Sequence, residues 1–112
     1  MNYKIITTKD FDRGVKPLLK KYRSLPDDLE NLKQELLKKP DIGEKLGDNI
    51  RKVRMAIASK GKGKRGGARI ITCNVLIDIK NTKIYLLTIY DKSDQDSISK
   101  EEIEILKRRN LL

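Results

Sequence analysis

Eight basic residues lie in one stretch of this sequence that contains no acidic residue. The stretch lies between Asp48 and Asp78, and its eight positive charges make up most of the net charge of +10. A positive field concentrated in this way attracts polyphosphates, most often a nucleic acid, and a solvated face without a partner explains it less well. We therefore expect a phosphate-binding surface that draws on Arg51, Lys52, Arg54, Lys60, Lys62, Lys64, Arg65 and Arg69.

The spacing of some of these cations suggests chemistry as well as binding. Lys52 and Arg54 are two residues apart, so on a strand they point to the same face. Arg69 begins a further predicted strand, and Tyr90 and Lys92 close the one after it. If these strands are neighbours, the five side chains converge. Lysine or tyrosine can then move protons while arginine holds a phosphate with a two-pronged contact, which is phosphoryl chemistry without histidine.

The sequence contains no histidine and a single cysteine, Cys73. Acid–base chemistry must therefore use Lys, Arg, Tyr, Asp or Glu, and a zinc site lacks its usual ligands. We expect neither a metal nor a cofactor. Cys73 lies in an apolar run and is predicted to be a buried core residue, and a lone cysteine fits the reducing cytoplasm.

The glycine-rich segment KGKGKRGGAR, residues 60–69, is predicted to be a flexible loop that presents cations. Its Gly61-x-Gly63-x-x-Gly66 pattern resembles a dinucleotide fingerprint only formally, because a strand and not a helix is predicted to follow. The phosphate loop of nucleotidases is also excluded, since no Gly-Lys-Ser/Thr ends the run.

The elements that must position these residues begin with a strand and two helices packed as a hairpin. Residues 3–7 favour a strand, and Thr8 or Thr7 can cap the helix that follows. Ser24 can cap a second helix, which ends before Pro40. The predicted apolar stripe of this second helix consists of Leu25, Leu29, Leu32, Leu36 and Leu37.

The remainder predicts three strands and a helix. Residues 50–58 alternate imperfectly, and ARIITCNVLIDI and KIYLLTIY, joined by an Asn-Thr turn, predict a β-hairpin. Ser99 and Glu102 form a capping box. The order β-α-α-β-β-β-α predicts one α+β domain over residues 1–112, with an antiparallel sheet of about four strands and helices on one face. The predicted inward positions of the first of these strands are Ile50, Val53, Met55 and Ile57.

No membrane segment is expected. The chain has no run of 18 apolar residues, and its N-terminus, MNYKIITTKDF, lacks the apolar segment of a secretory signal. Apolar and charged residues each make up 38% of the chain, which suits a small folded domain in the cytoplasm.

Several strings together resemble a known family. LGDNIRKVRMAI, GKGKRGGARIITCNV and IYLLTIYDKSD, followed by a short charged helix, are similar to the RelE/ParE superfamily of type II toxins, and most similar to its RelE/HigB-like branch. KKYRSLPDDLENL resembles the helical hairpin of that branch. The resemblance covers nearly the whole chain and implies the RelE-like fold, with an N-terminal strand, a helical hairpin, a sheet and a short C-terminal helix.

The resemblance implies a toxin that enters the ribosomal A site and cleaves mRNA without a metal, by attack of a 2′-hydroxyl on the adjacent phosphate. By similarity, Lys52 corresponds to a lysine that activates the nucleophile and Arg69 to an arginine that stabilises the pentavalent phosphate. Arg54 takes a neighbouring basic position, and Tyr90 and Lys92 lie where late-strand catalytic groups occur. The absence of histidine, and of any later tyrosine, leaves the general acid and base open. The remaining cations are expected to grip RNA: Arg51, Lys60, Lys62, Lys64 and Arg65.

Three functions remain possible from the sequence. The first is the ribosome-dependent endoribonuclease, which inhibits translation, and the set of basic residues favours it. The second is a ParE-like inhibitor of DNA gyrase, which shares the fold and needs no catalytic cluster. The third is an RNA-binding protein without activity. A toxin also implies a cognate antitoxin, which we expect to be acidic or partly disordered and either to cover the basic face or to hold the C-terminal helix away from its active position.

Overall fold

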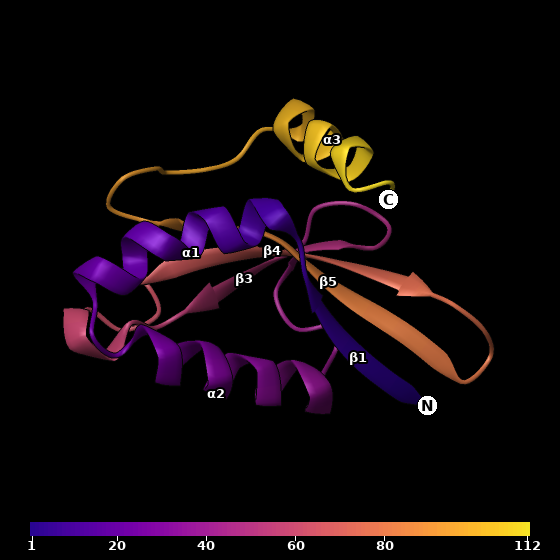
Figure 1. The fold of residues 1–112 in the computed structure, drawn as a ribbon, viewed down its shortest axis with the longest axis horizontal. Helices are drawn as coiled ribbons and strands as arrows, with labels where there is room; N and C mark the ends of the chain where they lie inside the picture. The colour runs from indigo at the N-terminus through magenta and orange to yellow at the C-terminus, as the bar shows by residue number, and fades with distance from the viewer.

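The computed structural model describes residues 1–112, which form one five-stranded β-sheet flanked by helices (Figure 1). The strands lie in the order β1-β5-β4-β3-β2. This arrangement confirms the predicted α+β class and order of elements, with β2 the one strand that the sequence does not predict. The elements are β1 (Asn2–Thr7), α1 (Lys9–Lys21), α2 (Leu25–Lys38), β2 (Glu44–Lys45), β3 (Ile50–Met55), the short 3-10 helix η1 (Ala58–Lys60), β4 (Ala68–Leu76), β5 (Asn81–Asp91) and α3 (Lys100–Arg109).

The sheet is mixed, with five strands where about four antiparallel ones are predicted. β2, β3, β4 and β5 pair antiparallel, whereas β1 runs parallel to residues 81–86 of β5. α1 packs against the rest of β5, where Gly14 lies so close that a Cβ atom would come within 2.9 Å of the carbonyl oxygen of Ile89. β1 and α1 together therefore cover this side of β5.

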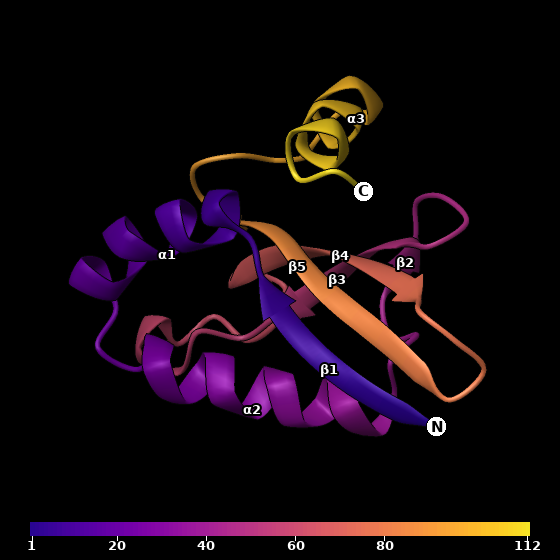
Figure 2. The ribbon, with the colours of Figure 1, turned by 45° about the vertical axis from the view of Figure 1, so that its right-hand side comes forward.

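Helices cover both faces of the sheet, so the expectation of helices on one face is wrong (Figure 2). α1 and α2 pack over a core that includes Ile70, whereas α3 packs over a smaller cluster that includes Ile71 and Cys73. The physical reason lies in β4, where consecutive apolar residues point alternately to the two faces and both faces therefore need cover. We refer to the side under α3 as the α3 face.

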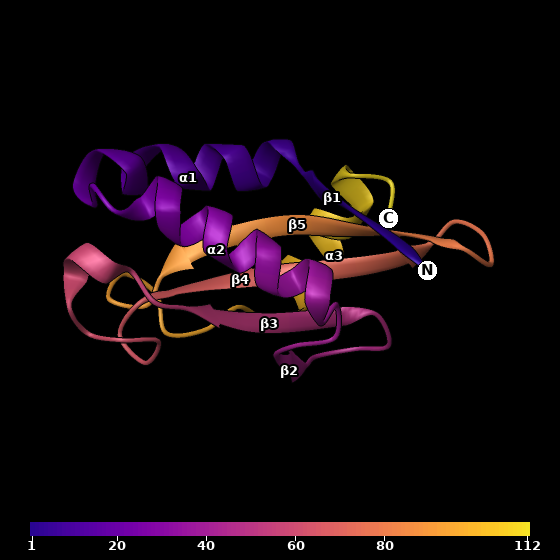
Figure 3. The ribbon, with the colours of Figure 1, turned by 90° about the horizontal axis from the view of Figure 1, so that it is seen from below.

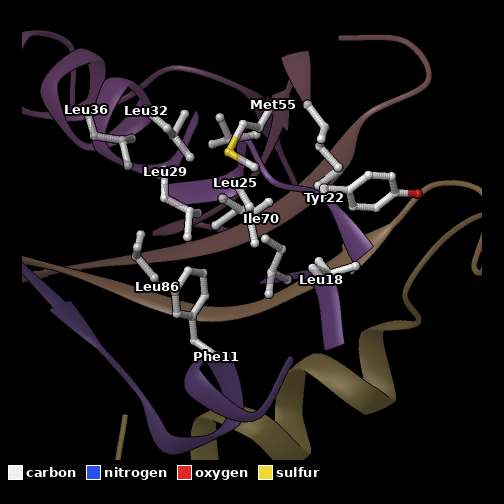
Figure 4. Close-up of a cluster of buried hydrophobic side chains, with 14 of the residues drawn as sticks. Phe11, Leu18, Tyr22, Leu25, Leu29, Leu32, Leu36, Met55, Ile70 and Leu86 are labelled. Atoms are coloured by element: carbon white, nitrogen blue, oxygen red, sulfur yellow. The ribbon is translucent and has the colours of Figure 1, made fainter. Parts of the chain in front are cut away.

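The leucines of α2 supply much of the larger core. The first four members of the predicted stripe are buried in the same cluster as Met55 and Ile70 (Figure 4). Leu37 is 38% exposed, so its inclusion in the stripe is wrong. It follows Leu36 directly, and one residue turns the helix by about 100°, away from the core. The buried members are Leu25, Leu29, Leu32 and Leu36.

Two of the three predicted helix caps form as expected. The hydroxyl oxygens of Thr8 and Ser99 accept hydrogen bonds from main-chain N–H groups of the first turns of α1 and α3, at 3.0 and 3.1 Å. Ser24 precedes α2 as predicted, but its hydroxyl donates to the Asp28 carboxylate at 2.7 Å instead of accepting from the helix.

Candidate functional site

Three strands bring Arg54, Arg69 and Tyr90 into one row across the sheet. Arg54 on β3 lies directly opposite Arg69 on β4, and Arg69 lies opposite Tyr90 on β5. Val53 and Met55, the neighbours of Arg54, are buried in the core under α2, so Arg54 points to the α3 face. We call these three residues the cross-strand row.

A β-bulge places Tyr90 in this row. The pairing of β4 with β5 shifts by one residue part-way along, which leaves Leu87 without a direct partner. If the pairing near the β4–β5 turn continued unshifted, Arg69 would lie opposite Ile89, and Tyr90 would miss the row. A bulge re-aims the side chains beyond it, and here it brings a phenol beside a guanidinium group.

The Arg69 guanidinium group holds the glycine-rich loop in place. Arg69 is only 4% exposed. Its Nη1 donates to the carbonyl oxygens of Lys64, at 2.9 Å, and of the residue preceding it, at 3.2 Å, while its Nη2 donates to that of Arg65 at 3.0 Å. Burial, and then the charge of Arg54, lower the pKa of Arg69, although a guanidinium group stays protonated at neutral pH. These bonds leave N–H groups of Arg69 for a bound phosphate, since a guanidinium group has five donors.

The Tyr90 hydroxyl is buried and has no hydrogen-bond partner. Tyr90 is 8% exposed, and its oxygen is one of two buried side-chain polar atoms that lack a partner. Burial raises the pKa of Tyr90, Arg69 opposes this rise, and the carboxylates of Glu102 and Glu44 add to it. The phenol is therefore protonated at neutral pH and free to donate its proton. Buried polar groups nearly always have a partner, so this hydroxyl calls for an explanation.

Lys52 lies beside the row on the same face, and Lys92 lies at its end. The Nζ of Lys52 is 3.2 Å from Oε2 of Glu44, because β2 pairs these two residues directly across from each other. The main-chain N–H of Lys92 donates to the Gly67 carbonyl at 3.0 Å, one step beyond the β4–β5 pairing. Its ammonium group, however, donates to the carbonyl oxygen of Asp96 at 2.7 Å. The fold thus brings Lys52 to the row and turns Lys92 toward the following loop.

The exposed part of the glycine-rich loop carries Lys62, Lys64 and Arg65. The loop lies at the end of the sheet opposite the β4–β5 turn (Figure 3). Gly61 and Gly63 have φ angles of 72° and 61°, in the left-handed region that favours glycine, and so permit its tight turns. Three cations are thereby presented to solvent on a loop that Arg69 anchors.

A comparison with protein families gives a match over almost the entire chain. The family model described as the RelE toxin of the RelE/RelB toxin-antitoxin system matches residues 3–110. This chain belongs to the RelE toxin family. The matched residues span every element from β1 to α3, including the cross-strand row and the loop. Membership confirms the resemblance to the RelE/ParE superfamily and implies a cognate antitoxin as a partner.

Within this RelE toxin, Lys60 lies in a buried network and not on the predicted RNA-binding surface. Its Nζ is 2.6 Å from Oδ1 of Asp91, and only 8% of its side chain is exposed. The Tyr22 hydroxyl and the main-chain N–H of Ser93 also donate to the Asp91 carboxylate. Burial by itself raises the pKa of Asp91, but the hydrogen bonds from Lys60, Tyr22 and Ser93 outweigh it and hold this pKa well below its usual range.

Arg51 is also separated from the row. It alternates with Ile50 and Lys52, which point to the α3 face, so its side chain leaves the sheet on the side of α2. Its Nη1 donates to the carbonyl oxygen of Gly43 at 3.4 Å. Three of the ten predicted site residues of the toxin, Arg51, Lys60 and Lys92, thus have side chains that are engaged away from the row and the exposed loop.

Three carboxylates of this toxin are not among the residues predicted from the sequence. Glu44 pairs with Lys52, Glu102 of α3 acts on Tyr90, and Asp91 anchors Lys60. No sequence signal could identify Glu44 or Glu102, because the two-residue β2 and the placement of α3 depend on tertiary packing. No cluster of three or more His, Cys, Asp or Glu side chains could hold a metal ion, and no helix is long and apolar enough to span a membrane.

Proposed function

We propose that this toxin is a ribosome-dependent endoribonuclease that cuts mRNA in the ribosomal A site and thereby inhibits translation. The cross-strand row carries the proposal, because a buried phenol without a partner lies directly beside Arg69 and in one row with Arg54. Leaving a buried hydroxyl unpaired costs about 1–3 kcal/mol of stability. A protein that only binds RNA, or only blocks DNA gyrase, has no reason to keep an unpaired hydroxyl at this cost. A reacting phosphodiester supplies the missing partner.

The proposed reaction is attack of a ribose 2′-hydroxyl on the adjacent phosphate. The bond from phosphorus to the 5′ oxygen breaks, which leaves a 2′,3′-cyclic phosphate on one fragment and a 5′-hydroxyl on the other. Negative charge grows on the phosphate oxygens in the transition state, and Arg54 and the remaining N–H groups of Arg69 stabilise it. The scheme needs no metal, because guanidinium groups supply the positive charge.

Tyr90 is proposed as the general acid that protonates the leaving 5′ oxygen, since burial raises its pKa and keeps it protonated. An ammonium group in an ion pair donates hydrogen bonds and accepts none, so the Glu44 carboxylate beside Lys52 takes the proton of the 2′-hydroxyl. Lys52 holds that carboxylate in place, whereas the Lys92 ammonium group stays engaged by Asp96 of the following loop and has no part in the proposed step.

The exposed loop is proposed to hold the RNA backbone. Lys62, Lys64 and Arg65 have no acidic neighbour in the sequence between Asp48 and Asp78, and they project from a loop that is anchored by Arg69. Contacts of this kind position the nucleic acid without reading its sequence. The proposed partners are messenger and ribosomal RNA in the cytoplasm, and the antitoxin is proposed to cover this same basic surface.

A defined mRNA incubated with programmed ribosomes, with cut sites mapped by primer extension, tests this function. We expect cuts that require both toxin and ribosomes and that slow at least about 10²-fold in Arg54→Ala, a loss typical for one charge-stabilising donor. Arg54 is exposed, so the substitution leaves the core closed.

Lys80→Ala is the matched control, because Lys80 is an exposed cation in the β4–β5 turn at the far end of the sheet. We expect it to cut at the wild-type rate. A message left intact by the wild-type toxin contradicts the proposal, and a DNA gyrase cleavage-complex assay then tests the ParE-like alternative.

A further inference from the structure

A cavity of about 570 Å³ opens at the outer edge of β3, between α2 and β2. This volume lies within the range of about 300–1,000 Å³ that is usual for small-ligand sites. The cavity exists because β2 pairs only with Arg51 and Lys52 and leaves the rest of the β3 edge uncovered. Gly43 forms its wall with a φ of 101°, where a Cβ atom would lie 2.5 Å from the carbonyl oxygen of Lys52. We call it the β3-edge cavity.

The lining of the β3-edge cavity suits a nucleotide better than a phosphate alone. Ile42 and Val53 provide an apolar surface, and Arg54 connects the cavity directly to the cross-strand row. Glu35 of α2 adds an exposed carboxylate that takes part in no ion pair. A free carboxylate repels a phosphate but accepts hydrogen bonds from N–H groups, which the bases of RNA carry. A second cavity, of about 150 Å³, adjoins Glu35 and Arg54 on the side of α2.

We infer that the β3-edge cavity binds one base of the mRNA next to the cut phosphate, and that Glu35 selects a base with an exocyclic amino group over uracil. This inference rests on the proposed nuclease function and gives it a base preference. Guanine offers two adjacent N–H donors to a carboxylate, and adenine and cytosine each offer an amino group. Uracil offers one N–H between two carbonyl oxygens, whose lone pairs repel a carboxylate. Single-stranded RNA is read through these same base edges.

A basic side chain of a protein partner is the competing occupant. The cavity is bordered by three cations, Lys52, Arg54 and Lys64, and by two carboxylates, of which Glu44 is already paired with Lys52. The remaining excess of positive charge disfavours a further cation there. The same three cations favour a nucleotide, whose phosphates they can neutralise while its base reaches Glu35. The charge of the lining therefore selects RNA over a basic peptide.

Cleavage of messages that differ only at the base beside the cut tests the inference. We expect wild-type toxin to cut at guanine about tenfold faster than at uracil, and Glu35→Gln to bring this ratio close to one, since a good base contact gives discrimination of this order. Glu30→Gln is the matched control, because Glu30 is an exposed carboxylate of the same helix outside the cavity. It should keep the wild-type ratio. An unchanged ratio in Glu35→Gln overturns the inference, and weakened antitoxin binding in that variant would then assign the cavity to a protein contact.

A second measurement tests base binding in the β3-edge cavity without relying on cleavage. The labelled toxin is titrated with 5′-GMP and with 5′-UMP, which carry the same phosphate, and amide chemical shifts are followed by NMR. We expect larger shifts with 5′-GMP at Gly43 and Val53, and loss of the difference in Glu35→Gln. Equal shifts with both nucleotides, or none at these residues, contradict the inference. A toxin that cuts no message but retains the 5′-GMP preference would refute only the proposed nuclease.

Discussion

Tyr90 and Asp91 are consecutive residues on β5, and they leave the strand on opposite faces with opposite consequences. The Asp91 carboxylate is completely buried and bonded by Lys60, Tyr22 and Ser93. The Tyr90 hydroxyl, also buried, has no partner. Both faces are rich in cations, so their amino-acid composition does not distinguish them. They differ in whether their buried polar atoms have hydrogen-bond partners.

The difference separates a region that stabilises the fold from a region available for chemistry. On the Asp91 side, the buried carboxylate is paired with the ammonium groups of Lys60 and Lys21, and the network joins α1, η1 and the end of β5. On the Tyr90 side, the chain tolerates an unpaired hydroxyl next to arginine, a cost that substrate binding would relieve. Opposite responses to mutation follow for these two neighbours.

The largest effect on activity is expected for Tyr90→Phe. We predict that mRNA cleavage falls about 10²- to 10⁴-fold, as for loss of a general acid, while stability stays equal or rises because the hydroxyl has no partner to lose. Primer extension and urea unfolding measure the two quantities. Tyr85→Phe is the control on the same strand and should leave cleavage unchanged. If Tyr90→Phe cuts normally, Tyr90 has no role as an acid.

Asp91→Ala is expected to give the reverse result, with a large loss of stability. It leaves the Lys60 ammonium group buried without its counter-charge, and breaking a buried pair in this way costs about 3–5 kcal/mol. Urea unfolding measures the loss. Asp94→Ala, which removes an exposed carboxylate from the next loop, should change stability by less than about 0.5 kcal/mol. Equal unfolding midpoints for the two variants would show that the Asp91 network contributes little.

The sequence predicts those parts of this contrast that depend on residues close together in the chain, and not those that depend on packing between distant segments. The two-residue spacing of Lys52 and Arg54 and the β4–β5 hairpin are local features, and both are found from the sequence. The bulge at Leu87 is not, yet it decides that Tyr90 and not Ile89 faces Arg69. Such a shift is fixed by packing on two faces of the strand, which no single segment encodes.

The charges show the same limit. Lys60 belongs by sequence to the basic loop, but its partner Asp91 is 31 residues away and only the fold brings the two together. Arg51 and Lys52 are adjacent on β3, so their side chains point to opposite faces of the sheet. A sequence can therefore identify a basic segment, whereas the assignment of each cation to the site or to the scaffold requires the tertiary structure.

The smallest expected difference between Asp91 and Tyr90 is in how stability and cleavage depend on pH. Asp91 has a lowered pKa, so its contribution to stability is present above the ordinary carboxyl pKa of about 3.9 and is lost as the pH falls below it. Tyr90 has a raised pKa, so its proton is retained, and cleavage should not decline for want of it, until the pH exceeds about 10. Unfolding midpoints from pH 3 to 7 in wild type and Asp91→Asn test the first point. If both proteins lose stability equally steeply as the pH falls, other carboxylates cause the loss.

The chemical end groups of the cut mRNA test the central claim most directly. Fragments made by wild-type toxin on programmed ribosomes are examined for a 5′-hydroxyl and a 2′,3′-cyclic phosphate, beside the same reaction with Tyr90→Phe. We predict both end groups with the wild-type toxin and almost no cut with the variant. A 5′-phosphate, or an intact message, would contradict attack by a 2′-hydroxyl at the cross-strand row.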